Sequence, residues 1–299
     1  MNESRFYAAD WLGVVWSNWG TLDPGGDHLS TFSTDEGLYR VRHPARPGLE
    51  YIGETGRSLR GRVRALAHGA FAEEMPYRDP HTAAPCLWAV QQEEAEKLEV
   101  SVTTPTLAED KQSRKAFEDA LIAVYRREMG ESPTANFGRI IDGYRQSTYR
   151  SGEERGGPLE PGQTVSNTED GVVPLDWSRS SDVLSEDWMG LLWSSPRPLA
   201  DADTSIPTDD GLYRIWREGE APPLEYIGQS SNLKSRLYRH RRNRDEALLF
   251  SYSELGKHDA QHKREEVETE LIGVHWLEVG ESPQDQFWMS YPSTLIAHV

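Results

Sequence analysis

Residues 37–62 read GLYRVRHPARPGLEYIGETGRSLRGR, and residues 211–236 read GLYRIWREGEAPPLEYIGQSSNLKSR. Both stretches carry GLYR, then LEYIG, then a basic segment that ends in an arginine, Arg62 or Arg236. The offset between the copies is 174 residues at both ends of the stretch. Two copies with so long a period indicate tandem domains rather than a solenoid.

The repeat continues on both sides of this stretch. DWLGVVWS at 10–17 matches DWMGLLWS at 187–194, and ALIAVYRREMGESPTANF at 120–137 matches ELIGVHWLEVGESPQDQF at 270–287. The last match has an offset of 150, so the first copy holds about 24 extra residues near positions 66–97. We predict a first domain over 1–144 with this insertion, a Gly-, Ser-, Glu- and Pro-rich linker over 145–182, and a second domain over 183–299.

The pattern inside each copy predicts an α+β fold. GLYR begins a stretch of alternating apolar and polar residues, and LEYIG follows a turn as its hairpin partner. A helix follows, with Ser58 or Asn232 as its N-cap. LEVSVTT or LLFSYSEL then predicts a third strand, and an amphipathic helix ends at Gly130 or Gly280. Each domain is thus expected to be a small three-stranded, mainly antiparallel sheet flanked by helices, in the order β-β-α-β-α.

Two Trp-rich segments, at 11–19 and 188–193, precede these elements. Exposed aromatic rings could serve as platforms for nucleic-acid bases. Their apolar neighbours favour the alternative, in which these segments pack in the core or form lids at the start of each domain.

Charge is distributed unevenly. The chain carries 49 acidic and 32 basic residues, for a net charge of −17, and only six of the basic residues are lysine. This composition is typical of proteins from a high-salt cytoplasm, although a GC-rich genome also favours arginine over lysine. Ten of the basic residues nevertheless lie in two stretches without acidic residues, 55–72 and 226–244. Such focused positive charge favours phosphate binding, whereas the alternative is the solvated face of a helix.

Other features bound the class of protein. No apolar run is long enough to cross a bilayer, and the N-terminus does not resemble a secretion signal. Cys86 is the only cysteine, which excludes a disulfide framework within the chain. We therefore expect a cytoplasmic protein that does not associate with a membrane.

These motifs together resemble the GIY-YIG nuclease family. Its first tripeptide corresponds to Gly37-Leu38-Tyr39 and Gly211-Leu212-Tyr213, and its second to Tyr51-Ile52-Gly53 and Tyr226-Ile227-Gly228. The family's helix arginine corresponds to Arg62 and Arg236, and its metal-binding glutamate to Glu118 and Glu268. Two positions differ between the copies. His240 matches a histidine of some family members where the first copy has Leu66, and Asn136 matches the family's asparagine where the second copy has Gln286.

The resemblance implies hydrolysis of phosphodiester bonds in DNA with one Mg²⁺ or Mn²⁺ in each active domain. One tyrosine of each pair, Tyr39/Tyr51 or Tyr213/Tyr226, would act as general base. Arg62 and Arg236 have the planar fork that suits phosphate oxygens. Glu118 and Glu268 would each bind the metal through hard oxygen ligands. His240 could assist proton transfer, and Asn136 could position a backbone segment or the substrate.

Other basic side chains are predicted to contact the DNA. They are Arg57, Arg60, Arg64, His68, Lys234, Arg239, Arg241, Arg242 and Arg244.

Three functions remain open at this stage. In the first, the two domains form an intramolecular pseudo-dimer that cuts both strands of a duplex, so the chain is expected to act as a monomer. In the second, one domain cuts and the other binds DNA. In the third, the chain binds nucleic acid without cutting it. The insertion and the linker are candidates for target recognition, or are plain surface excursions.

Overall fold

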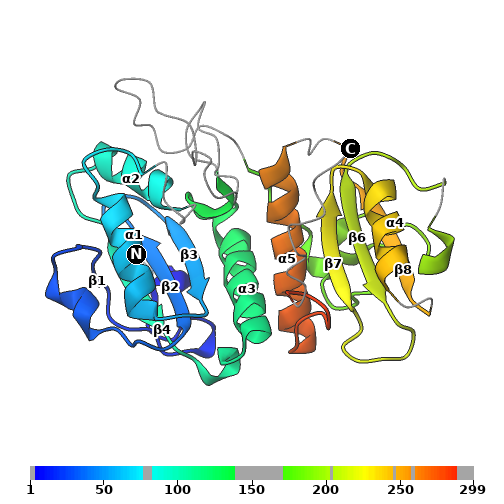
Figure 1. Ribbon diagram of the computed structural model, residues 1–299, viewed down its shortest axis with the longest axis horizontal. Coiled ribbons are helices and arrows are strands. Elements are labelled where there is room, and N and C mark those ends of the chain that lie inside the picture. Colours follow the sequence, from blue (N-terminus) through cyan, green and yellow to red (C-terminus); the bar gives the residue numbers. More distant parts are fainter. Residues whose placement is uncertain are drawn as a thin grey trace.

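The computed structural model describes residues 4–76, 83–138, 171–202, 205–244, 247–256 and 260–287. Most of the predicted linker, residues 77–82 of the predicted insertion and the ends of both predicted domains lie outside the described residues. Figure 1 shows two similar α+β units on either side of a central pair of helices.

The first unit contains four strands and three α-helices among the described residues. They are β1 (Gly20–Thr21), β2 (Gly37–Arg42), β3 (Tyr51–Thr55), α1 (Leu59–Ala70), α2 (Ala84–Glu93), β4 (Glu99–Thr103) and α3 (Lys111–Met129). The second unit repeats this order without a counterpart of α2. Its elements are β5 (Arg197–Pro198), β6 (Gly211–Trp216), β7 (Tyr226–Ser230), α4 (Leu233–Asn243), β8 (Leu249–Glu254) and α5 (Gln261–Val279).

Short 3-10 helices occupy several connections. They span Arg5–Tyr7, Trp11–Gly13, Asp27–Thr31, Thr106–Ala108, Asn136–Gly138, Trp177–Arg179, Trp188–Gly190 and Leu199–Asp201.

Each sheet has four antiparallel strands rather than the predicted three. The strand orders are β1-β4-β2-β3 and β5-β8-β6-β7. The three predicted strands are present, and the fourth in each unit is the two-residue β1 or β5, which pairs with β4 or β8. A two-residue strand is too short to show alternation, so sequence pattern could not predict it. In both sheets the LEYIG strand, β3 or β7, lies at an edge.

The predicted helix ends agree with the structure. The Ser58 and Asn232 side chains accept the Gly61 and Ser235 backbone N–H groups, which caps α1 and α4. Helices α3 and α5 end at Gly130 and Gly280 in the left-handed conformation, at φ 84° and 83°, which glycine adopts without a Cβ clash.

Helices cover both faces of each sheet. In the first unit Tyr39 and Val41 face α1 and α2, whereas Leu38 and Ile52 face α3. The second unit repeats this division, since Tyr213 faces α4 and Leu212 faces α5. The alternation of side chains along β2 and β6 thus supplies one hydrophobic core on each face.

The two units meet along α3 and α5, which lie side by side at the centre of the molecule (Figure 1). The helices are antiparallel, because Arg126 near the end of α3 contacts Glu266 near the start of α5, while Gln112 near the start of α3 donates to the Pro283 carbonyl beyond α5. The two backbones approach closely at Gly273, where an added Cβ would lie 2.4 Å from the Asp119 carbonyl oxygen. A glycine is therefore needed at this point of the helix–helix contact.

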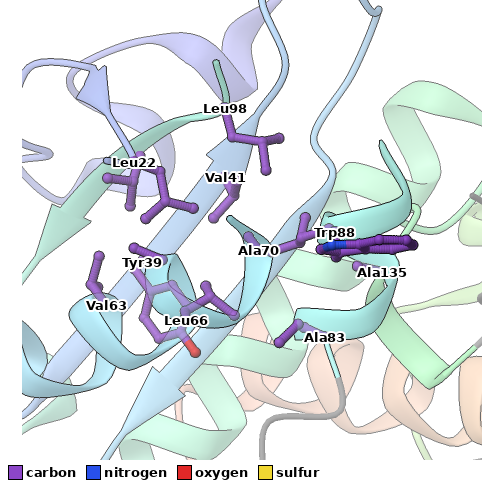
Figure 2. Packing of buried hydrophobic residues seen from close by; sticks show 14 of the residues in the cluster. Leu22, Tyr39, Val41, Val63, Leu66, Ala70, Ala83, Trp88, Leu98 and Ala135 are labelled. Carbon is purple, nitrogen blue, oxygen red and sulfur yellow. The ribbon is translucent and has the colours of Figure 1, made fainter. Parts of the chain in front are cut away.

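The described part of the predicted insertion is mainly helix α2. Its residues Ala84 to Val90 are buried, and Figure 2 shows Trp88 and Ala83 packed beside Ala70 of α1 and Ala135. The Trp88 indole N–H donates to the Ala72 carbonyl at 2.9 Å. The inserted helix is therefore part of the first unit's core.

The described end of the predicted linker, residues 171–182, packs against the second unit. Val172, Leu175 and Trp177 contact its α5-side core, and Trp177 Nε1–H donates to Glu270 at 2.8 Å. None of the described helices combines the length and the apolar character needed to span a membrane.

Candidate active sites

The predicted site residues of the first unit gather near the edge strand β3. Tyr39 on β2 and Tyr51 on β3 lie on the α1 side of the sheet, with ring centroids 5.8 Å apart. Arg62 on α1 donates Nε–H to the Tyr39 hydroxyl oxygen at 3.2 Å. Sequence positions on two strands and a helix are thus brought to one point.

Gly53 makes this arrangement possible. A Cβ at this position would lie 2.7 Å from the Tyr39 hydroxyl oxygen and 2.5 Å from the Tyr51 ring. The glycine of the second tripeptide therefore permits the Tyr39 ring to lie over β3, which is a packing requirement rather than a turn requirement.

Glu118 reaches this edge from α3 on the opposite face. It accepts a hydrogen bond from the Glu54 backbone N–H, and burial raises the pKa of its carboxyl to about 7, although the nearby Lys115 charge acts in the other direction. The Arg62 charge also acts on Glu118, so these two predicted residues share one electrostatic environment.

Burial also raises the pKa of the two tyrosines. The pKa of Tyr51 lies well above its usual range, whereas the Arg62 cation partly opposes the effect of burial on Tyr39. Tyr39 is therefore the better placed of the two to become a phenolate.

The Asn136 side chain binds the backbone of β3 through two hydrogen bonds. Its side-chain oxygen accepts the Ile52 N–H at 3.1 Å, and its side-chain N–H donates to the Ile52 carbonyl at 3.0 Å. Gln286 has the same role in the second unit, where its side-chain oxygen accepts the Ile227 N–H at 3.1 Å. The apparent difference between the copies at this position is therefore conservative in structural terms.

The second unit brings the equivalent residues together. The Tyr213 and Tyr226 rings are stacked with centroids 5.9 Å apart, and a Cβ at Gly228 would lie 2.3 Å from the Tyr213 hydroxyl oxygen. Glu268 accepts the Gln229 backbone N–H at 3.1 Å, and burial raises the pKa of its carboxyl to about 7.

The two sites differ in what contacts the first tyrosine. His240 Nε2 lies 2.9 Å from the Tyr213 hydroxyl oxygen. The Arg236 guanidinium, by contrast, makes no hydrogen bond or ion pair with any residue that the structure describes, although its charge acts on Tyr213 and Glu268. In the first unit Leu66 occupies the position of His240, and Arg62 contacts the tyrosine instead.

The predicted DNA-contacting residues differ in their exposure to solvent. One group is exposed and consists of Arg57, Arg64, His68, Arg239, Arg241 and Arg242. Lys234 is half-buried, and Arg60 donates Nε–H to the Phe32 carbonyl at 2.7 Å. The Arg244 side chain is only 4% exposed and forms ion pairs with Glu225 and Asp285. Arg244 therefore belongs to the interior of the second unit rather than to its exposed basic surface.

The arginine of each GLYR motif has a structural role that the sequence did not predict. Arg40 and Arg214 are fully buried, with guanidinium carbons 4.3 Å from the Trp16 ring centroid and 4.4 Å from that of Trp193. Each also donates to backbone carbonyls, such as those of Ala8 and Ser185. The Trp-rich segments thus pack around a buried cation, and the repeat of Arg with Trp in both copies was the available signal.

Glu54, whose charge acts on Glu118, belongs to a network of ion pairs. Arg114 pairs with Glu54 at 2.9 Å and with Glu36 at 2.7 Å, and its second-unit equivalent, Arg264, donates to the Gln229 side chain at 3.2 Å. No group of three or more His, Cys, Asp or Glu side chains arranged for a metal ion is found among the described residues.

No family model, no curated protein and no solved structure matches this chain. The function is therefore inferred from the geometry of the two sites.

Proposed function

We propose that both units are metal-dependent nuclease sites of the GIY-YIG type and that the chain hydrolyses phosphodiester bonds in DNA. One observation carries this proposal: the tyrosine pair, the α1 or α4 arginine and the α3 or α5 glutamate converge near an edge strand in both units. These residues come from two strands and two helices of each unit, and both copies of the repeat bring them together.

The residues of each site have complementary roles in this proposal. Arg62 and Arg236 would bind phosphate oxygens and stabilise the charge that develops as the phosphodiester is attacked. Tyr39 and Tyr213 would accept a proton from the attacking water, because each hydroxyl oxygen lies beside a nitrogen that can stabilise a phenolate.

Glu118 and Glu268 fit a single hard divalent cation, Mg²⁺ or Mn²⁺. Each has a carboxylate oxygen occupied by a backbone N–H, which orients the group, and burial raises its pKa to about 7. A cation would replace the proton that burial favours, and Mg²⁺ commonly binds proteins through one or two carboxylates while keeping several waters. When bound, the metal supplies charge neutralisation and a more acidic water.

The paired units suit the cutting of a duplex. Most single-site nucleases form symmetric dimers to cut two strands, and here α3 and α5 join two sites within one chain. The chain is accordingly proposed to act as a monomer. The exposed arginines on α1 and α4 would contact the DNA backbone on either side.

A second candidate function has one cutting unit and one binding unit. The observation that favours it is the contact between His240 and Tyr213 in the second unit. The first unit has Leu66 at the position of this histidine. In that case the chain would nick DNA rather than break both strands.

The proposal can be tested with the full chain on supercoiled plasmid in Mg²⁺ or Mn²⁺, at low and at molar salt. The double variant Glu118→Gln/Glu268→Gln should abolish cleavage and retain DNA binding. The matched control is Glu128→Gln/Glu278→Gln, at equivalent exposed positions of the same helices, which should cut normally. Cleavage by the double variant, or salt-sensitive binding without cleavage of any DNA form, would contradict the proposal.

A further inference from the structure

The second site contains a chain of hydrogen bonds that continues beyond its tyrosine. His240 is buried on α4 and lies between Tyr213 and Arg244. Its Nε2 is 2.9 Å from the Tyr213 hydroxyl oxygen, and its Nδ1 accepts the Arg244 Nε–H at 3.1 Å. The histidine thus contacts a different partner through each ring nitrogen.

These contacts determine which nitrogen of His240 carries its proton. An arginine side chain is always protonated and can only donate, so Nδ1 must accept and must itself be unprotonated. A neutral imidazole then has its proton on Nε2, which donates to Tyr213. Burial lowers the pKa of His240 to about 3, assisted by the charges of Arg244, which follows α4, and of Arg236 and Arg239 on this helix. The facing groups from the sheet, Tyr213 and Tyr226, carry no charge while protonated.

Arg244 is itself held by acidic groups from two other segments. Its guanidinium pairs with Glu225 at 3.3 Å, next to β7, and with Asp285 in the loop after α5. It also lies over the Tyr226 ring, 5.2 Å from the centroid. Because the Arg244 side chain is 4% exposed and bonded on several sides, its Nε–H has a defined direction.

The first unit replaces this network with apolar residues. Leu66, Ala70 and Ala135 stand at the positions of His240, Arg244 and Asp285, and all three are buried in one core cluster. Figure 2 shows Leu66 and Ala70 of α1 near Ala83 and Trp88 of the inserted segment. The three changes occur together, and helix α2 packs beside them.

We propose that Arg244 is a positioning residue of the second site, which holds His240 as a fixed Nε2–H donor to Tyr213. His240 thereby stabilises the Tyr213 phenolate instead of taking the tyrosine's proton. The first site achieves the same contact differently, because Arg62 Nε–H donates directly to Tyr39. The catalytic meaning of this contact rests on the proposed nuclease function, whereas the protonation state of His240 does not.

The first test reads the tautomer of His240 without any cleavage assay. Long-range ¹H–¹⁵N NMR on the full chain with ¹⁵N-labelled histidine distinguishes protonated from unprotonated ring nitrogens, and the loss of a signal in His240→Asn assigns it among the nine histidines. We expect protonated Nε2 and unprotonated Nδ1 throughout the neutral pH range. A proton on Nδ1, or on both nitrogens, would overturn the proposal.

The second test separates the Arg244 hydrogen bond from its charge. Arg244→Lys keeps a cation beside Glu225 and Asp285 but lacks the Nε–H, so His240 should sample both tautomers in the folded protein. The control is Arg242→Lys, an exposed arginine of the same helix, which should leave the tautomer unchanged. An unchanged His240 signal in folded Arg244→Lys would also overturn the proposal.

Activity then tests the role in catalysis. With the first site inactivated by Glu118→Gln, Arg244→Lys should slow nicking by about tenfold to a hundredfold, in the range expected when a catalytic group is mispositioned. An unchanged nicking rate would overturn the positioning role alone. If wild-type His240 has the expected tautomer and yet no DNA is cut under any condition, the proposed nuclease function fails instead.

Discussion

At the scale of single residues, the two copies place different side chains in the same role. Asn136 and Gln286 both bind the backbone of the LEYIG strand, and Arg62 and His240 both contact the hydroxyl of the first tyrosine. In an alignment of the two copies these positions simply differ in residue type. The geometry shows which of them preserve a hydrogen bond.

Loss of the Asn136 amide should destabilise the first unit. In Asn136→Leu the buried N–H and C=O of Ile52 lose their partners, at a cost of about 1–3 kcal/mol for each unsatisfied group. Urea unfolding would measure this loss. Asn136→Gln places there the residue of the second copy and should cost less, so an equal loss in both variants would contradict the role of the side-chain amide.

The glutamates should make stability depend on pH. In the folded chain the Glu118 and Glu268 carboxyls have pKa values of about 7, raised by burial above the value of 4.5 for a solvated glutamate. Between these values the folded state binds more protons than the unfolded state, so the free energy of unfolding falls as pH rises. The stabilising contribution is fully present below 4.5 and is lost as pH passes 7.

Urea unfolding without metal, at about pH 5 and about pH 8, would measure this dependence. Glu118→Gln/Glu268→Gln should lose less stability than wild type over this interval, because glutamine does not titrate. Equal losses in the two proteins would contradict the raised pKa values.

At the scale of secondary-structure elements, the inserted helix α2 covers the positions at which the second unit has its histidine network. The helix packs beside Leu66 and Ala70, where the second unit has His240 and Arg244. A histidine introduced at position 66 should therefore not gain the hydrogen-bond network of His240. The position is apolar, and alanines replace both the arginine that contacts His240 and the aspartate that pairs with this arginine.

Leu66→His should destabilise the first unit by about 1–3 kcal/mol, because it buries a polar ring among apolar side chains. Leu66→Met, which keeps volume and polarity, should cost less than about 1.5 kcal/mol. Thermal or urea unfolding distinguishes the two variants. A Leu66→His protein as stable as wild type would contradict the expected cost of burying a histidine in this core.

The sequence predicted the elements that both units share, apart from the shortest strands, and it selected the residues that gather at each site, but it did not predict helix α2 of the first unit. Matching offsets placed the three main strands, both motif helices, their caps Ser58 and Asn232, and the glutamates of α3 and α5. It could not predict β1 and β5, which are too short to show periodicity, or the burial of Arg40 among tryptophans from a distant segment. It also assigned Arg244 to the DNA surface, because charge along a helix does not reveal which side chains meet acidic partners from other segments.

At the scale of the whole molecule, a buried ionic cluster joins the units. Arg126 on α3 pairs with Glu266 at 2.9 Å and with Glu270 at 3.1 Å on α5, and all three side chains are fully buried. The equivalent positions in the opposite copy hold Trp276, Ala116 and Ala120. The pseudo-symmetric contact thus uses ions at one end and apolar groups at the other, which distinguishes the two ends of the interface.

Arg126→Leu should destabilise the junction by about 3–5 kcal/mol, because it leaves two buried carboxylates without their cation. Arg127→Leu, at the neighbouring exposed position, is the matched control and should have a small effect. Denaturant unfolding followed by probes in each unit would measure the change. Equal effects of the two substitutions would contradict the importance of the ionic cluster.

We propose that two nuclease sites in one chain each cut one strand of a DNA duplex. The decisive measurement is cleavage of supercoiled plasmid by the single variants Glu118→Gln and Glu268→Gln. We expect wild type to yield linear DNA and each single variant to stop at nicked circles. Normal linearisation by either single variant would contradict it.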